Sequence, residues 1–336
     1  MTPITGPKAW RGETLARETS WIVTLTDAEL ADIDRAVATA KASGLPLERI
    51  QREHFPLTVA RAKLEQAVTE MYDGRGFVVL RGLPVRRYSD DDVGLIFWGF
   101  GRYMGAPLYQ NPQGDLLGHV YDHGRTYGQI DVRGYETNAY LPYHTDAGDV
   151  VGLLCLRRSL EGGLSSIVSS TTVHNEILAQ HPEYLGLLYN GYYYIRREAA
   201  LTERGVSERP IPVFGYQDGV VSCRYIRNQI NAGAVKREIP LTTFERAALD
   251  FLDEQTRRPD LRLDMDLQAG DIQFINNYTI LHSRTGFVDG PEPEQKRHML
   301  RLWLKFPKPW PLSPEFPTHM GYKPAKDTPE LVEAER

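Results

Sequence analysis

Apolar residues in the first hundred positions recur at helical spacing behind polar caps. Thr26 and Glu29 form a capping box before one such stretch, and Ser89 with an acidic turn precedes another. The pattern predicts helices over 26–44, over 58–73 and from Ser89 onward. The residues expected to face inward are Leu30, Ile33, Val37, Leu64, Val68, Met71, Val93, Ile96, Phe97 and Phe100. Residues 1–25 carry no such pattern and are predicted to be an extended arm.

Beyond residue 75 the pattern changes to short apolar runs of strand length. Runs of this kind lie at 76–82, 150–156, 167–168, 192–195 and 220–225, and two more strands are expected around His282 and Arg297. Helices interrupt them at about 172–179, before Gly191, and over 242–257, where Thr242 and Glu245 form a second capping box.

Many short strands behind a few helices predict a mainly β fold with flanking helices and a double-stranded β-helix, or jelly-roll, core. Residues 1–75 are expected to form an arm and helices that pack on this core, and 76–306 the jelly-roll domain. Residues 307–336, which include seven prolines, are expected to be a C-terminal tail, ordered or not. The whole is predicted to be one structural domain. Side chains from different strands of such a sandwich converge inside its open end.

Composition narrows the class of protein. The 336 residues are 41% hydrophobic and 25% charged, which is enough for a substantial core. A net charge of −5, from 39 Lys and Arg against 44 Asp and Glu, argues against a nucleic-acid partner, which needs a basic face. No apolar run reaches membrane-spanning length, the N-terminus lacks the apolar segment of a secretory signal, and two cysteines make no disulfide framework. A cytoplasmic location is expected.

The stretch Tyr143-His144-Thr145-Asp146 carries the clearest chemical signal. If it is a strand, His144 and Asp146 point to the same face, since side chains two residues apart share a face of a sheet. A second histidine on a distant strand would complete a 2-His-1-carboxylate triad, which suits non-haem Fe(II) and leaves coordination positions open. His282 is the candidate for that second histidine, although a lone histidine after an apolar pair is also what a structural core histidine looks like.

Two arginines follow at strand spacing. Arg297, Met299, Arg301 and Trp303 would share one face of a strand, and His298, Leu300, Leu302 and Leu304 the other. The leucine-rich face is expected to belong to the core. The arginines would then line a polar cavity and bind an anion, because a guanidinium holds a carboxylate in a bidentate manner. The alternative is that they make surface ion pairs on an edge strand.

The order of these segments resembles the Fe(II)/2-oxoglutarate-dependent dioxygenases of the taurine dioxygenase-like (TauD/TfdA) family, in the clavaminate synthase-like superfamily. The resemblance runs from about residue 77 to 306. It is carried by Gly76-Phe77-Val78-Val79-Leu80-Arg81-Gly82, Leu141-Pro142-Tyr143-His144-Thr145-Asp146, Gly162-Gly163-Leu164-Ser165, Gly270-Asp271-Ile272 through His282, and Arg297-His298-Met299-Leu300-Arg301. Ser165 stands where the family usually has threonine, and both residues offer a hydroxyl.

The resemblance implies an oxidoreductase that uses Fe(II), 2-oxoglutarate and O2. His144, Asp146 and His282 would be the metal ligands and catalytic residues, and Arg297 with Ser165 would bind the far carboxylate of 2-oxoglutarate. Arg301 would contact the other end of the co-substrate or an anionic group of the substrate. The family chemistry is hydroxylation of a small organic substrate with release of succinate and CO2. Related halogenases lack the carboxylate that Asp146 supplies here.

The identity of the substrate does not follow from the sequence. Gln110, Asn111, Asn138 and Tyr140 are candidate substrate residues because they lie near the metal motif along the chain, and Asn138 would share the face of His144 if the strand were regular. A small substrate is expected, whether anionic or not, with no membrane partner. The segment His119-Val120-Tyr121-Asp122-His123 is interpreted as structural rather than as a second metal site. Oligomeric state stays open.

Three other readings of function remain at this point. The same cofactor chemistry would also serve desaturation or cyclisation in a biosynthetic pathway. It would also serve oxidation of a peptide, whereas the acidic balance counts against nucleic acid. A third reading, from another class, is a non-catalytic jelly-roll sensor or binding protein, against which the complete triad and arginine pair weigh.

Overall fold

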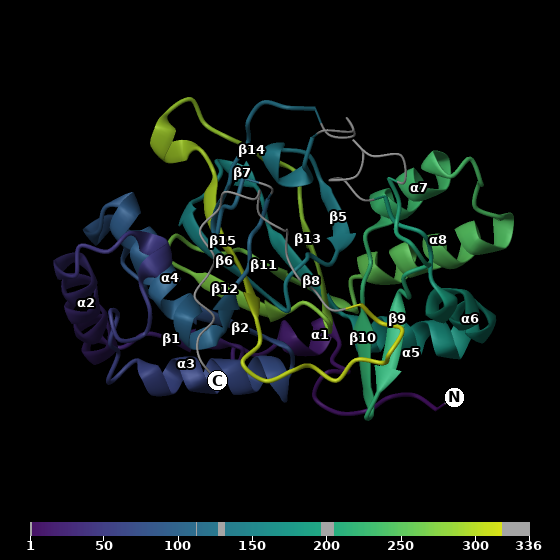
Figure 1. The fold of residues 1–336 in the computed structure, drawn as a ribbon, viewed down its shortest axis with the longest axis horizontal. Coiled ribbons are helices and arrows are strands. Elements are labelled where there is room, and N and C mark those ends of the chain that lie inside the picture. The colour runs from purple at the N-terminus through teal and green to yellow at the C-terminus, as the bar shows by residue number, and fades with distance from the viewer. Residues whose placement is uncertain (1, 112, 127–131, 196–204, 318–336) are drawn as a thin grey trace.

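Two β-sheets face one another at the centre of the molecule, with helices on both sides (Figure 1). The computed structural model describes residues 2–111, 113–126, 132–195 and 205–317. The larger sheet has the order β1 (Ile22–Thr24), β2 (Phe77–Arg81), β12 (Ile272–Asn276), β6 (Val150–Arg157), β15 (His298–Lys305) and β3 (Ala106–Pro107), and β4 (Leu117–Val120) also pairs with β15. The smaller sheet has the order β11 (Arg262–Met265), β8 (Ser165–Ser169), β13 (Ile280–Arg284) and β5 (Leu141–His144).

Pairing in these sheets is antiparallel except between β1 and β2. Two small ribbons complete the β structure: β9 (Phe214–Gln217) with β10 (Val220–Cys223), and β7 (Glu161–Gly162) with β14 (Phe287–Val288). Two antiparallel sheets stacked in this way form the jelly-roll core that the strand pattern predicts.

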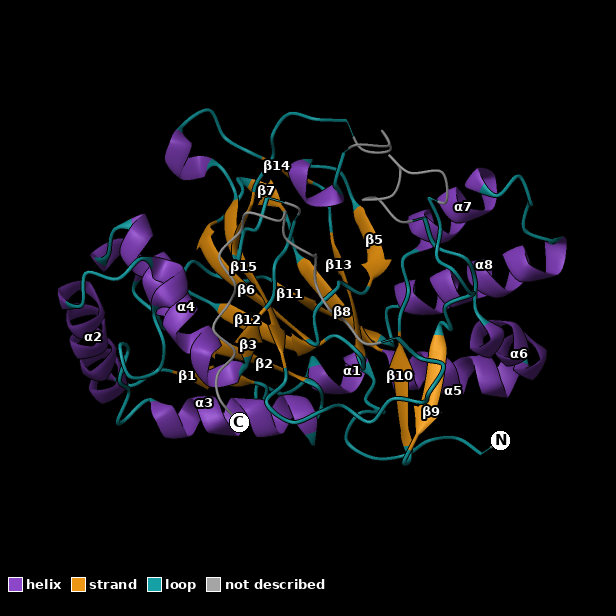
Figure 2. Cartoon of the chain, in the orientation of Figure 1, coloured by secondary structure: helices purple, strands orange, loops and turns teal. Residues whose placement is uncertain are grey.

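The helices divide into two groups, one beside each sheet (Figure 2). The first group is α2 (Asp27–Ala42), α3 (Arg61–Tyr72) and α4 (Asp90–Met104), and the second is α5 (Ser170–Gln180), α6 (Pro182–Asn190), α7 (Arg227–Lys236) and α8 (Thr243–Arg257). The short α1 (Gly12–Leu15) packs against β11. Single 3₁₀ turns lie at Leu47–Arg49, Val85–Arg87, Gly134–Glu136 and Pro293–Gln295. Within the described residues no helix is long and apolar enough to cross a membrane.

Alternation along the strands explains the layers. On β15, Met299 and Trp303 point into the space between the two sheets, and Leu300, Leu302 and Leu304 point to the first helical group. The central strand β6 alternates in the same way. Successive residues of a strand face opposite sides, so a strand that is apolar on both faces must be covered on both. The second helical group covers the outer face of the smaller sheet.

Most elements match the sequence pattern, and a few differ. Both capping boxes are present, at Thr26–Glu29 and Thr242–Glu245. Residues 1–25 are not wholly extended, because α1 and β1 lie within them. The segment 192–195 makes isolated bridges rather than a strand, and α7 carries no signal that predicts it. In the tail, Trp310 and Phe316 are buried in the core, and residues 318–336 lie outside the described residues.

Candidate metal and anion centre

The register of two strands brings the candidate histidines together. Strands β5 and β13 pair antiparallel, and His144 lies directly opposite His282. Residues directly opposite one another in a ladder project from the same face. The two imidazole rings accordingly lie 4.3 Å apart, centroid to centroid, at one end of the space between the sheets.

Asp146 reaches the same point from a turn. The sequence pattern placed both His144 and Asp146 on a strand, but β5 ends at His144. The backbone N–H of Thr145 turns away to bond the carbonyl of Tyr225, and the Thr145 hydroxyl accepts from the Tyr225 N–H. The side chain of the buried Asn277 then holds the main chain of Asp146 at both its N–H, at 2.9 Å, and its carbonyl, at 2.8 Å.

The three side chains could hold one metal ion. Asp146 Oδ1 lies 3.8 Å from His144 Nε2, and Asp146 Oδ2 lies 3.8 Å from His282 Nε2. One ligand atom from each residue falls within 4.8 Å of the others, and among the described residues this is the one cluster of three or more such groups. His144 Nδ1 lies 2.8 Å from the Pro142 carbonyl, which fixes the proton on Nδ1 and leaves the Nε2 lone pair directed at the cluster.

The protonation states suit a divalent metal. Burial and the neighbouring His144 lower the pKa of His282 to about 3, so its imidazole is neutral at pH 7. Burial alone would raise the pKa of Asp146, but the charge of Arg301, the two imidazoles and a hydrogen bond from Trp303 lower it to about 2. Two neutral imidazoles and one carboxylate are the donor set that non-haem Fe(II) takes.

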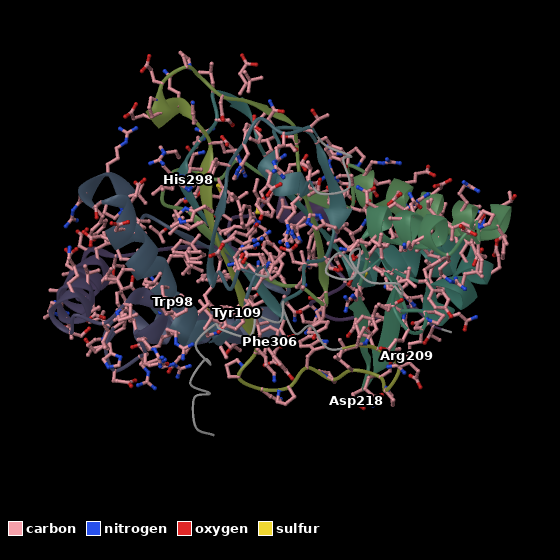
Figure 3. All side chains as sticks on the ribbon, turned by 45° about the horizontal axis from the view of Figure 1, so that its top comes forward. Trp98, Tyr109, Arg209, Asp218, His298 and Phe306 are labelled. Atoms are coloured by element: carbon pink, nitrogen blue, oxygen red, sulfur yellow. The ribbon has the colours of Figure 1, made fainter. Side chains whose placement is uncertain are left out.

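Strand β15 brings basic groups to the same cavity. Arg297, just before the strand, and Arg301 within it line a hollow of about 550 Å³, counting the part open to solvent, together with the three candidate ligands. His298, labelled in Figure 3, alternates to the other face, where its Nε2 lies 2.9 Å from His119 Nδ1. The predicted polar face of this strand is therefore present, and the His119 segment contributes nothing to the metal cluster.

Arg297 is buried with an open donor. Its side chain lies over the ring of Phe287, 5.3 Å from the centroid, and its Nη1 has no hydrogen-bond partner in the described part of the chain. Burial lowers its pKa to about 10, so it stays charged at pH 7. Ser165, on β8, lines the same hollow and donates to Gln273 Oε1 at 3.1 Å. A buried guanidinium N–H without an acceptor fits an incoming carboxylate.

Arg301 is held from three sides. Its Nε donates to Gln110 Oε1 at 2.8 Å, and its guanidinium lies between the rings of Tyr135 and Trp303, 4.8 and 4.6 Å from their centroids. Its Nη1 comes within 3.6 Å of Asp146 Oδ2. Stacking and a fixed Nε leave little freedom to the guanidinium, which is thus pre-positioned beside the metal cluster.

A third arginine, Arg284, was not singled out by the sequence analysis. Its Nη2 donates to the carbonyls of Thr137, at 2.8 Å, and Ala139, and it lies over the ring of Phe287, at 4.7 Å. Burial and the neighbouring Arg297 lower its pKa to about 10. The available signal was strand alternation, since Arg284 follows His282 by two residues on β13 and so faces the same cavity.

The candidate substrate residues do not gather at the cavity. Gln110 is buried. Its amide oxygen accepts from Arg301 Nε, and its amide nitrogen donates to the carbonyls of Leu116 and Arg301, so Gln110 supports Arg301. Asn111 closes a turn with Asp115. Asn138 and Tyr140 are exposed and precede β5, so the regular strand that would align Asn138 with His144 is absent. The substrate role of these four residues stays a prediction.

Known proteins match this chain over most of its length. The family model described as taurine catabolism dioxygenase TauD, TfdA family matches residues 42–303. FR-33289 synthase of Streptomyces rubellomurinus (strain ATCC 31215) is 31% identical over 90% of both chains. The taurine hydroxylase-like protein SAT17 of Stachybotrys chartarum is 29% identical over 88% of this chain and 77% of its own. A solved asparagine oxygenase, in complex with Fe(II), 3-hydroxyasparagine and succinate, superposes with a TM-score of 0.66 at 17% identity, over 84% of this chain and 93% of its own.

Proposed function

The chain belongs to the taurine catabolism dioxygenase TauD, TfdA family, and from that premise we propose that His144, Asp146 and His282 are its Fe(II) ligands. It is a non-haem Fe(II)- and 2-oxoglutarate-dependent dioxygenase that hydroxylates a small organic substrate. The observation that carries the ligand assignment is the convergence of two imidazoles, that of His282 neutral, and one ionised carboxylate at the end of the jelly roll.

Arg297 and Ser165 are assigned to the far carboxylate of 2-oxoglutarate. The support is the buried Nη1 of Arg297, which lacks an acceptor among the described residues, and the position of both side chains in the hollow that holds the metal cluster. Binding a carboxylate there would satisfy that donor in a setting where water competes weakly. The charge of Arg297 persists across the physiological range because its lowered pKa is still about 10.

The metal and the protein side chains would contribute different parts of the reaction. Bound Fe(II) supplies the redox chemistry, in which O2 oxidises 2-oxoglutarate to succinate and CO2 and places one oxygen atom on the substrate. The chain's own residues position the partners. Arg297 orients the co-substrate along the cavity, Arg301 fixes an anionic group beside the metal, and apolar walls from Val120, Leu153 and Met299 limit water.

We infer further that the primary substrate is anionic. Three guanidinium groups, Arg284, Arg297 and Arg301, face the hollow against the single carboxylate of Asp146. Metal-bound imidazoles count as neutral ligands, so the side chains contribute two positive charges, to which Fe(II) adds two and from which dianionic 2-oxoglutarate removes two. A buried excess of positive charge is costly unless an anion offsets it. A carboxylate, sulfonate or phosphonate on the substrate would do so, with Arg301 as its nearest contact.

The test measures succinate formed from 2-oxoglutarate with Fe(II) under air. The substrate panel contains amino acids, sulfonates, phosphonates, aryloxy acids, betaines and short peptides. One anionic class should stimulate turnover strongly, and its uncharged amide or ester analogue should not. His144→Ala should abolish turnover and metal binding, while His119→Ala, which changes an exposed histidine outside the cluster, should leave both intact.

Three results would each contradict a part of the proposal. Intact metal binding in His144→Ala would make the ligand assignment wrong. Equal stimulation by charged and uncharged analogues would remove the anionic substrate while leaving the iron site in place. A folded, iron-loaded protein that forms no succinate under any condition would favour a sensor or binding role.

A further inference from the structure

The indole of Trp303 donates a hydrogen bond to the carboxylate of Asp146. Trp303 is 4% exposed, and its Nε1 lies 2.8 Å from Asp146 Oδ2. A buried indole N–H ordinarily finds an acceptor, and most acceptors in a protein are neutral carbonyls. Here the acceptor is an ionised oxygen in the metal cluster, which makes the bond charge-assisted.

The two oxygens of Asp146 are therefore not equivalent. Oδ2 accepts the Trp303 bond, whereas Oδ1 accepts none among the described residues and faces His144 Nε2 at 3.8 Å. Arg301 Nη1, at 3.6 Å from Oδ2, is beyond hydrogen-bonding distance. Asn277 holds the main chain of Asp146 but does not touch its carboxylate. The rotation of the carboxylate thus depends on Trp303.

Trp303 is itself fixed from two sides. Its ring stacks on the Arg301 guanidinium, 4.6 Å from the centroid, on the same face of β15. The loop that carries Asp146 passes directly over it at Gly148, where an added Cβ would come within 2.9 Å of the Trp303 Cβ. The loop can approach this closely because residue 148 has no side chain. The indole and the carboxylate are therefore held at a set distance by both chain segments.

We propose that Trp303 is a positioning residue of the metal centre, whose N–H holds Asp146 Oδ2 and so leaves Oδ1 to bind the metal. This inference rests on the proposed function, since it takes Asp146 as an iron ligand. A carboxylate that binds through one oxygen takes one coordination position instead of two. The remaining positions stay open for 2-oxoglutarate and O2, which the reaction needs together.

The test compares metal binding, without turnover, in wild type and in three variants that each lack one indole N–H. The N–H donor is removed in Trp303→Phe and, with the bicyclic ring retained, by replacing Trp303 with 3-benzothienylalanine, in which sulfur takes the place of N–H. The matched control is Trp310→Phe, which removes a buried indole N–H that donates to Ser222 Oγ at 2.9 Å, away from the cluster. Co(II) alone is the probe, with its dissociation constant measured by calorimetry and its visible absorption recorded.

Both changes at Trp303 should weaken Co(II) binding by about 10- to 100-fold, the range for losing a partner of a metal ligand. Both should also shift the visible bands of bound Co(II), because Asp146, no longer held at Oδ2, would bind the metal through both oxygens. Trp310→Phe should change neither. Wild-type affinity and spectrum in the benzothienylalanine protein would overturn the inference, even if Trp303→Phe were impaired, because ring packing would then be the cause. Unaltered Co(II) binding in His144→Ala would instead point to failure of the metal assignment itself.

Discussion

Asp32 and Asp146 are two largely buried carboxylates with the same low pKa and different surroundings. Each has a pKa of about 2, although burial alone would raise it. Asp32, on α2, accepts hydrogen bonds from the backbone N–H groups of Thr58, Val59 and Ala60, from the Thr58 hydroxyl and from Arg35. Asp146 accepts one side-chain hydrogen bond, and its other neighbours are an arginine and two imidazoles beyond bonding distance.

This difference distinguishes a carboxylate that holds the fold together from one that is available to bind a ligand. The lone pairs of Asp32 are saturated by the turn that leads into α3, so nothing remains for a ligand. Asp146 is ionised by nearby positive charge and retains free lone pairs that converge with two imidazole nitrogens. A low pKa by itself therefore does not identify a binding site. A carboxylate whose lone pairs are free, and which lies beside other groups that lack partners, does.

The largest expected effect on ligand affinity is at Arg297. Arg297→Ala should weaken 2-oxoglutarate binding by about 2–5 kcal/mol, because the co-substrate carboxylate would be left buried without its partner. Calorimetry on the protein loaded with Co(II) measures this. Arg158→Ala, which removes an exposed arginine paired with Asp266, is the control and should leave the affinity unchanged. An unchanged affinity in Arg297→Ala would remove the co-substrate role.

At Asp32 the expected effect is on stability alone. Asp32→Asn should lower the free energy of unfolding by about 2–4 kcal/mol, since it weakens several charge-assisted bonds to the start of α3. Denaturant unfolding gives this value, and Asp266→Asn, at an exposed carboxylate, serves as the control. Metal affinity should stay at the wild-type level. Loss of metal binding in folded Asp32→Asn would mean that the role of Asp32 is not structural alone.

The pH dependence of the free energy of unfolding tests the structural role of another buried titratable group, His174. His174 is buried beside Tyr189, and burial lowers its pKa from 6.5 to about 4. The unfolded chain therefore takes up this proton first as pH falls. The stability that the neutral His174 contributes is fully present above pH 6.5 and is lost between pH 6.5 and about 4, by about 3 kcal/mol.

Unfolding free energies measured from pH 7.5 to 4 should therefore fall less steeply in His174→Gln than in wild type. Saturating metal should stabilise the cluster but leave the contribution of His174 to the slope in place. An unaltered slope in His174→Gln would mean that burial does not hold this imidazole neutral.

The smallest effect is expected at Ser165. Ser165→Ala should reduce 2-oxoglutarate affinity by about 0.5–1.5 kcal/mol, the net value of one hydrogen bond. Ser166→Ala, on the opposite face of β8 and bonded to Asp264, should leave the affinity unchanged. A larger loss at Ser166 than at Ser165 would place the co-substrate on another face of the strand.

Sequence patterns predicted the parts of the site that regular structure carries. Alternation on β15 placed Arg297 and Arg301 on the face that lines the cavity, and the motif order predicted the jelly roll and the approach of His144 to His282. The patterns could not predict contacts set by loops. Gln110 supports Arg301 rather than lining the cavity, because the fold brings residues 191 positions apart into contact.

The Trp303 bond to Asp146 was hidden for a related reason. Strand alternation placed Trp303 on the face of the arginines, but its partner lies in a turn after β5, where the expected strand continues no further. Three tertiary features set that turn: the Thr145–Tyr225 bonds, the Asn277 side chain and the close approach at Gly148. None of these three contacts follows from the local pattern of residues along the chain.

The decisive experiment counts the Fe(II) ions bound per chain, titrated without oxygen, in wild type, Asp146→Asn and Asp32→Asn. We expect one Fe(II) per chain in wild type and in Asp32→Asn, and binding weakened by more than about 100-fold in folded Asp146→Asn. Tight binding of one Fe(II) by folded Asp146→Asn would contradict this expectation, because the carboxylate with free lone pairs would then not be what the metal requires.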